Sequence, residues 1–185
     1  MLRLDQARAL LHARVSPRLY EHSLRVAEYS ATLADTWDAP REQALLAGVL
    51  HDYCRELPGD ELMALADELG VRFGPIERQR PRQLLHAPVA AAVLAAQDLP
   101  GECREAIARH TVGGAGMSAL AKCLYVADAA EPGRDYDGVE AVRGLAVSSL
   151  DAAVGECVRQ TLVHLMARRR PIHPATMDLY NESCE

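Results

Sequence analysis

Aromatic residues and positive charge are both scarce in this chain of 185 residues. Only 4% of the residues are aromatic, with one Trp and one Phe, and the formal net charge is −6. A protein that binds nucleic acid or an acidic membrane needs a basic face to meet the phosphates, so the charge argues against both classes. A small anionic substrate stays open, because a metal ion and a few arginines create a local positive pocket. The sequence therefore predicts a small-molecule partner, with no nucleic acid and no membrane.

Paired cysteines, long apolar runs and a secretory leader are also missing. The five cysteines form no Cys-x-x-Cys pair, and their odd number does not suit a disulfide framework. No stretch reaches the length of a membrane-spanning helix. The N-terminus carries an early acid, Asp5, where a leader would be basic and then apolar. We expect a cytoplasmic protein with reduced thiols.

Alanine and leucine dominate the sequence, and both favour helices. Proline and glycine divide the chain into helix-sized blocks, without an internal repeat or a linker. The sequence thus predicts an all-α helical bundle in a single domain over residues 1–185, with its core at about 17–170 and a tail at 171–185. We expect helices at about 4–13, 17–37, 40–53, 58–70, 84–97, 99–111, 117–130 and 149–170, and loops at 72–81 and 131–138.

An adjacent His51-Asp52 pair ends the most apolar of these blocks, residues 43–50. A helix that is apolar all round belongs in the centre of a fold, where an ionisable pair is costly unless it is coordinated. His22 and Asp128 likewise lie among apolar neighbours in other expected helices. Imidazole nitrogens and carboxylate oxygens are good ligands for divalent first-row metals. We therefore predict a metal site at His22, His51, Asp52 and Asp128, with positions left open for water and substrate, as hydrolysis requires.

Two more histidines and two arginines fit the same pattern. His86 opens one expected helix and His110 closes another; these two could hold a second metal or donate hydrogen bonds to a phosphate. Arg55 follows the His-Asp pair by three residues and Arg134 follows Asp128 by six, and the forked donor set of arginine suits phosphate. Each of these residues alone is more often structural. The prediction of a metal site therefore depends on the order of these residues along separate helices.

At these residues the sequence resembles the HD superfamily of metal-dependent phosphohydrolases. More narrowly, it resembles the bacterial YqeK family of symmetrical bis(5'-nucleosyl)-tetraphosphatases. The His-Asp core is shared by many phosphohydrolases, whereas the EPGRD stretch is more specific. The matching stretches span about residues 17–181, and they are YEHSLRVA (20–27), LAGVLHDY (46–53), LLHAPVAA (84–91), AIARHT (106–111), GMS (116–118), YVAD (125–128) and EPGRD (131–135).

The resemblance implies an HD-domain fold and the cleavage of diadenosine tetraphosphate, a dinucleoside polyphosphate, into two ADP. It implies iron as the metal, with Mn, Co or Zn as alternatives, and a tail at 171–185 that lines the nucleotide pocket. Arg55 stands where many family members carry Lys; it keeps the charge but does not donate a proton at neutral pH. The residues expected to face the nucleotide are Leu84, Leu85, His86, Arg109, His110, Arg134, Ile172, His173 and Thr176.

The candidate catalytic residues are Asp52, His86, His110 and Arg55. In the mechanism that we expect, a metal lowers the pKa of a water, Asp52 orients that water, and the histidines and Arg134 stabilise charge on the phosphate oxygens. Three alternatives stay open: another HD nucleotidase or phosphodiesterase, a non-catalytic metal and nucleotide sensor, and a purely structural helical protein. The sequence is compatible with a monomer or a homodimer.

Overall fold

The computed structural model describes residues 2–184, and this part of the chain contains helices and loops but no strand. The all-α prediction is confirmed. The helices are α1 (Leu4–His12), α2 (Pro17–Thr36), α3 (Arg41–Leu50), α4 (Gly59–Glu68), α5 (Pro75–Gln79), α6 (Pro81–Leu84), α7 (His86–Val93), a 3-10 turn (Leu94–Gln97), α8 (Gly101–Arg109), α9 (Ala119–Ala130), α10 (Val139–Ala146), α11 (Leu150–Ala167) and α12 (Pro174–Glu182).

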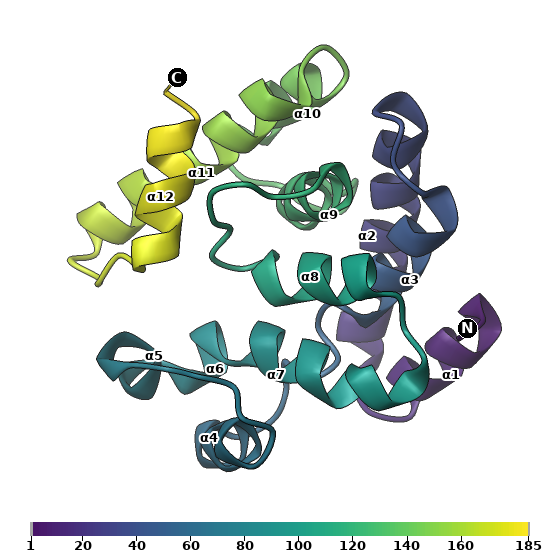
Figure 1. Cartoon of the computed structure of the whole chain (residues 1–185). Helices are drawn as coiled ribbons and strands as arrows, with labels where there is room; N and C mark the ends of the chain where they lie inside the picture. Colours follow the sequence, from purple (N-terminus) through teal and green to yellow (C-terminus); the bar gives the residue numbers. More distant parts are fainter. Residues whose placement is uncertain (1, 185) are drawn as a thin grey trace.

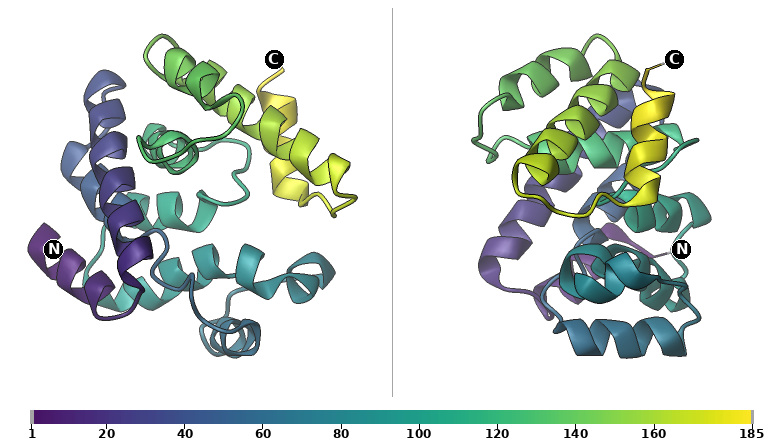
Figure 2. Two further views of the ribbon diagram at one scale, coloured as in Figure 1. Left: turned by 180° about the vertical axis from the view of Figure 1, so that it is seen from behind. Right: turned by 90° about the vertical axis from the view of Figure 1, so that its left-hand side faces the viewer.

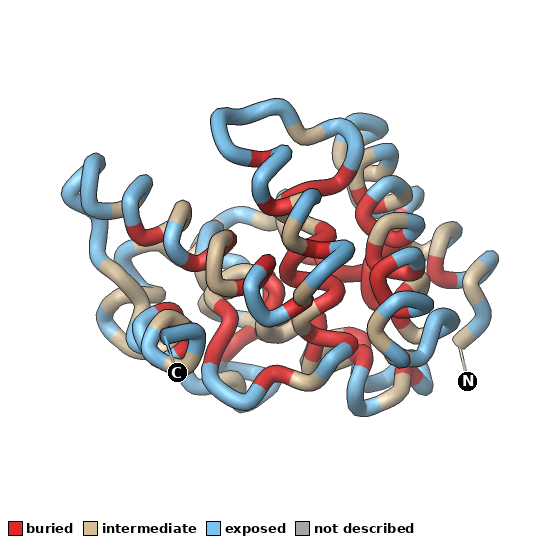
Figure 3. The backbone as a smooth tube through the Cα atoms, turned by 90° about the horizontal axis from the view of Figure 1, so that it is seen from above, coloured by how far each residue is buried: buried red, intermediate tan, exposed pale blue. Residues whose placement is uncertain are grey.

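Helix α9 occupies the centre of the molecule, where Figure 1 shows it nearly end-on. It packs against α2, α3, α8, α10 and α11. In the views of Figures 1 and 2, α10–α12 lie together on one side of α8 and α9, and α4–α7 lie on the other. Buried residues concentrate in this central region (Figure 3). Helix α3 is buried on nearly all sides, as its composition predicts.

Serine residues cap the N-termini of the three longest helices, α2, α9 and α11. Ser16 accepts a hydrogen bond from the amide of Leu19 at the start of α2, where Pro17 occupies the first helical position. Ser118 and Ser149 cap α9 and α11 in the same way. Such caps satisfy amides that have no partner within the helix. They explain why the expected starts of these helices agree with the structure to within two residues.

Three helices, α10, α12 and the short α5, occur where the sequence predicts none. The first is α10, whose buried Val139, Val142 and Ala146 recur at helical spacing and cover α9 and α11. The second is α12, within the expected tail; it begins because Pro174 occupies the first turn and the His173 side chain accepts a hydrogen bond from the Ala175 amide.

Two expected boundaries also differ. The expected loop at 72–81 contains α5, a helix of 5 residues whose single proline and polar side chains give it the composition of a loop. The expected helix at 84–97 starts as α6 and α7 and ends in a 3-10 turn from Leu94 to Gln97. None of the helices within residues 2–184 has both the length and the apolar character needed to cross a bilayer.

Gly48 permits the close approach of α3 to α2, so we expect Gly48→Ala to destabilise the protein. An added Cβ would overlap the Cα of Ala27 and lie 2.8 Å from its backbone nitrogen. Overpacking of this kind costs about 1–3 kcal/mol, measurable as a lower midpoint in urea unfolding. Gly144→Ala in α10 is the control: nothing lies within 4 Å of its Cβ, so it should be neutral or stabilising. Equal midpoints for Gly48→Ala and the wild type would contradict this account.

Candidate metal centre

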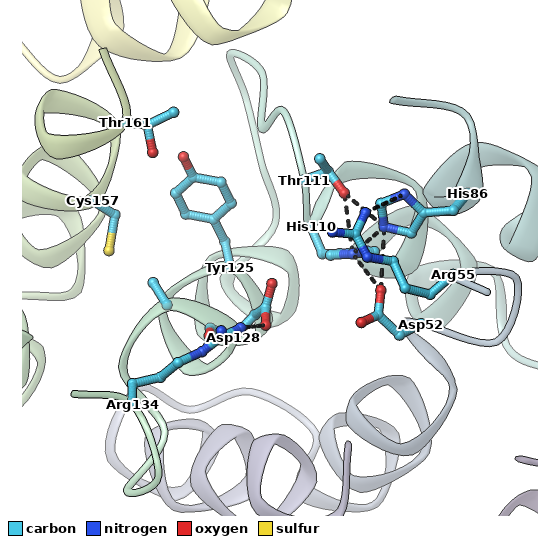
Figure 4. Close-up of a pocket in the computed structure, with 11 residues that line it drawn as sticks. Asp52, Arg55, His86, His110, Thr111, Tyr125, Asp128, Arg134, Cys157 and Thr161 are labelled. Atoms are coloured by element: carbon cyan, nitrogen blue, oxygen red, sulfur yellow. Dashed lines mark hydrogen bonds and ion pairs between the residues drawn. The ribbon is translucent and has the colours of Figure 1, made fainter. Parts of the chain in front are cut away.

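The structure brings His22, His51, Asp52 and Asp128 together. His22 comes from the middle of α2, Asp128 from α9, and the His-Asp pair from the turn after α3. Asp128 Oδ1 lies 3.1 Å from His22 Nε2 and 3.7 Å from His51 Nε2, while Asp52 Oδ2 lies 3.5 Å from His51 Nε2. Figure 4 shows Asp52 and Asp128 on facing sides of one pocket. The four predicted ligands therefore present nitrogen and oxygen atoms to one shared space.

His51 provides the test of whether a cation fits this space. Its side chain is fully buried, and its Nδ1 donates a hydrogen bond of 2.8 Å to the carbonyl of Gly48. This bond leaves the lone pair on Nε2, which has no hydrogen-bond partner within the described chain. Burial lowers the pKa of His51 to about 4, so the ring is neutral at physiological pH. A buried, unpartnered imidazole nitrogen that faces two carboxylates fits a divalent metal.

His86 and His110 extend this cluster on the side of Asp52. Both are buried, their Nε2 atoms are 3.2 Å apart, and they lie 3.2 Å and 3.5 Å from Asp52 Oδ1. Despite the burial, the neighbouring histidines hold the pKa of Asp52 well below its usual range. Two sets of donor atoms are close enough to hold an ion, each within 4.8 Å: His22, His51 and Asp128, and His51, Asp52 and His110.

Glu131 fixes the orientation of His22, a role that the sequence analysis misses. The Glu131 side chain is 1% exposed and lies 3.1 Å from His22 Nδ1. Arg25 donates to it at 2.7 Å and the amide of Gly133 at 2.5 Å. Although burial opposes the charge, these hydrogen bonds lower the pKa of Glu131 to about 2. The sequence contains one signal for this role: Glu131 follows Asp128 by three residues, about one helical turn, and so lies near it.

Arg134 and Arg55 lie on opposite sides of the pocket (Figure 4). Arg134 donates to Asp128 twice, at 2.8 Å to the backbone oxygen and 2.7 Å to Oδ1. Arg55 Nη1 donates to the carbonyl of Arg82 at 3.2 Å and lies 3.2 Å from His86 Nδ1. Both guanidinium groups line the pocket. They add positive charge beside the two carboxylates.

The pocket has a volume of about 200 Å³, and a groove of about 390 Å³ adjoins it. Thr111 and Thr161 line both cavities, although the sequence analysis names neither. Of the residues expected to face a nucleotide, Leu84, His173 and Thr176 line the groove.

The side chains of Leu85, Arg109 and Ile172 do not line that groove. Leu85 is 1% exposed within the core, and Ile172 packs against the core. Arg109 binds Glu105 at 3.1 Å and the carbonyl of Ala115 at 2.9 Å. The family resemblance implies a nucleotide contact for these three residues, and that contact stays a prediction.

We expect Glu131→Gln to weaken metal binding by about 10- to 100-fold, because the outer partner of a ligating histidine sets its orientation and basicity. The measurement is a Mn(II) titration followed by the electron paramagnetic resonance signal of the free ion. Glu28→Gln, an exposed change on the same helix α2 as His22, is the matched control and should leave the affinity unchanged. The same affinity in both variants would refute the role of Glu131.

The chain resembles known proteins over almost its whole length. The family model described as HD domain matches residues 19–133. A symmetrical bis(5'-nucleosyl)-tetraphosphatase of Bacillus subtilis is 31% identical, with 96% of this chain and 95% of the relative aligned. A protein with the same name from Staphylococcus aureus is 30% identical, covering 97% of this chain and 94% of the relative.

A crystal structure from Clostridium acetobutylicum has the same fold. It is an HD superfamily hydrolase, described as involved in NAD metabolism, and it superposes with a TM-score of 0.93 at 28% identity. The alignment covers 100% of this chain and 98% of the other. The residues that converge at the pocket, His51 and Asp52 among them, lie within the matched region. The chain therefore belongs to the HD domain family, together with the bacterial symmetrical bis(5'-nucleosyl)-tetraphosphatases.

Proposed function

We propose that this protein is a metal-dependent hydrolase that cleaves diadenosine tetraphosphate symmetrically into two ADP. One observation carries the proposal: His22, His51, Asp52 and Asp128 converge in a pocket lined by arginines, in a chain whose relatives of that activity align from end to end. The complete set of ligands favours turnover over a sensor that only binds nucleotide.

The four converging residues would hold the metal. A bound divalent ion supplies Lewis-acid charge and lowers the pKa of water towards neutrality. We propose iron; Mn, Co and Zn suit the same nitrogen and oxygen donors. His110, which shares a donor set with His51 and Asp52, would hold a second ion or bind phosphate. The cytoplasmic location expected from the sequence stays a prediction.

The protein's own residues would position water and phosphate. Asp52 would orient the attacking water, whose oxygen bonds to one of the two inner phosphorus atoms. The bond from that phosphorus to the central bridging oxygen breaks, and this oxygen leaves with the other ADP. His86, His110 and the two arginines of the pocket would bind the non-bridging oxygens, where charge stabilisation most helps phosphoryl transfer. Arg55 contributes charge and no proton.

The cavity volumes support one arrangement of the substrate. A pocket of about 200 Å³ is below the range of about 300–1,000 Å³ of cavities that enclose whole small ligands, so it suits phosphate groups without a nucleoside. The adjoining groove of about 390 Å³ would take the first adenosine. Leu84, His173 and Thr176 line it, so α12 forms part of its wall. This is how we propose that the tail contributes to nucleotide binding.

Hydrolysis of diadenosine tetraphosphate by protein loaded with Fe(II), Mn(II) or Co(II) tests the proposal. We expect ADP as the sole product, resolved by chromatography, and loss of turnover after chelation or in Asp52→Ala, which removes a ligand and the orienting carboxylate. Asp67→Ala, which changes an exposed residue of α4, should behave as wild type.

Other outcomes identify the alternatives. AMP plus ATP as products would exclude a symmetrical cut. Turnover of mononucleotides or cyclic nucleotides in its place would indicate another HD phosphohydrolase. Tight nucleotide binding by the metal-loaded protein with no turnover would indicate a sensor.

A further inference from the structure

A second groove opens from the metal pocket on the side of α2 and α6. Its volume is about 460 Å³, and it shares Asp52, Arg55 and Arg134 with the pocket. Among its lining residues, Gln83 alone also lines the groove of Leu84, His173 and Thr176. The pocket therefore connects two grooves, each large enough for part of a nucleotide.

Arg18 and Arg82 give this second groove unpaired positive charge; we call it the arginine groove. Both residues are exposed, and within residues 2–184 neither guanidinium group has a hydrogen bond or an ion pair. The acid at the rim, Glu56, forms no ion pair with either arginine; its two oxygens accept hydrogen bonds from Ser16, from Oγ at 2.5 Å and from the backbone amide at 2.8 Å. In a chain of net charge −6, unpaired arginines beside a metal site indicate an anion site.

Both arginines are fixed to elements that form the metal pocket. Arg18 lies four residues before His22 on α2, and hence on the same face of the helix. The carbonyl of Arg82 accepts the hydrogen bond from Arg55 and lies 3.1 Å from His86 Nδ1. The backbone positions of the two arginines relative to the pocket are thus set by the same elements that place its histidines.

A third cavity, of about 870 Å³, also adjoins the pocket and is a poorer anion site. It is lined by Tyr136, Asp137 and Gln160, and its arginines already have partners. Arg159 is paired with Glu156 at 2.6 Å, and Arg134 with Asp128 at 2.7 Å. A polyphosphate that leaves the metal pocket therefore meets unpaired cations in the arginine groove and paired ones here.

We propose that the arginine groove binds the phosphates of the second nucleoside diphosphate half of the substrate, with Arg18 and Arg82 as specificity-determining residues. The inference rests on the proposed function. A symmetrical cut places one nucleoside diphosphate half on each side of the central bridging oxygen, and the pocket is too small for either nucleoside. Two grooves that meet at the pocket satisfy this requirement, and they favour substrates with anionic groups on both sides of the scissile bond.

The test is a graded charge series at both positions, assayed on diadenosine tetraphosphate with the Mn(II)-loaded enzyme. R18A/R82A removes charge-assisted contacts to phosphate, so we expect it to raise KM by about tenfold or more. It should leave kcat within about threefold, because these contacts bind the ground state and the transition state equally. R18K/R82K should retain most of the affinity, and R18E/R82E should lose the most.

Two further readouts separate phosphate binding from other roles. Adenosine 5'-tetraphosphate keeps the phosphates but lacks the second adenosine, so its KM should rise by the same factor as that of the dinucleotide. The dependence of log KM on log salt should become less steep in R18A/R82A, because fewer charge contacts remain. Arg72→Glu is the matched control: Arg72 is exposed, has no partner within residues 2–184 and lines neither groove.

The outcomes are distinct. Unchanged KM in R18E/R82E, or a rise confined to the dinucleotide, would overturn the phosphate role of the groove while symmetrical hydrolysis stands. A similar rise in Arg72→Glu would show a general charge effect and would equally overturn it. A wild-type enzyme that does not hydrolyse either tetraphosphate would overturn the proposed function and this inference with it.

Discussion

The burial of several ionisable groups at one point is the constraint on which this structure depends. Asp52 is buried and Asp128 is half-buried, and they carry like charges where an isolated carboxylate would be destabilising. Histidine nitrogens from three other segments, together with Arg134, surround them. The surrounding helices must hold these groups at fixed separations. Gly48 contributes by letting α3 lie directly against α2, which places His51 beside His22.

Most of the helical framework was predictable because its signals are local. Apolar residues and serine caps determine α2, α9 and α11, and a nearly uniform apolar composition determines α3. Ionisable residues within apolar helices indicated the metal cluster. Helix α10 was missed although its Val139, Val142 and Ala146 recur at helical spacing. The tail helix α12 escaped prediction because its burial depends on neighbours supplied by the rest of the fold. Glu131 escaped for the same reason: its partner His22 lies 109 residues away. The arrangement of cavities around the pocket depends on tertiary packing and could not be read from the sequence.

The charge distribution reconciles an acidic protein with an anionic substrate. The net charge of −6 is a property of the whole surface, whereas binding depends on the few groups within a Debye length of the pocket. There, Arg55 and Arg134 face a site that would also hold a cation.

The central position of α9 also has a consequence for motion. Asp128 belongs to a helix enclosed by α2, α3, α8, α10 and α11, so its amides exchange with solvent only in openings that approach global unfolding. Helices α5 and α12 lie at the edge of the molecule and bury few side chains, none in α5 and Thr176 and Leu179 in α12. Local openings there need less free energy than openings of α9, and they leave the candidate metal ligands in place.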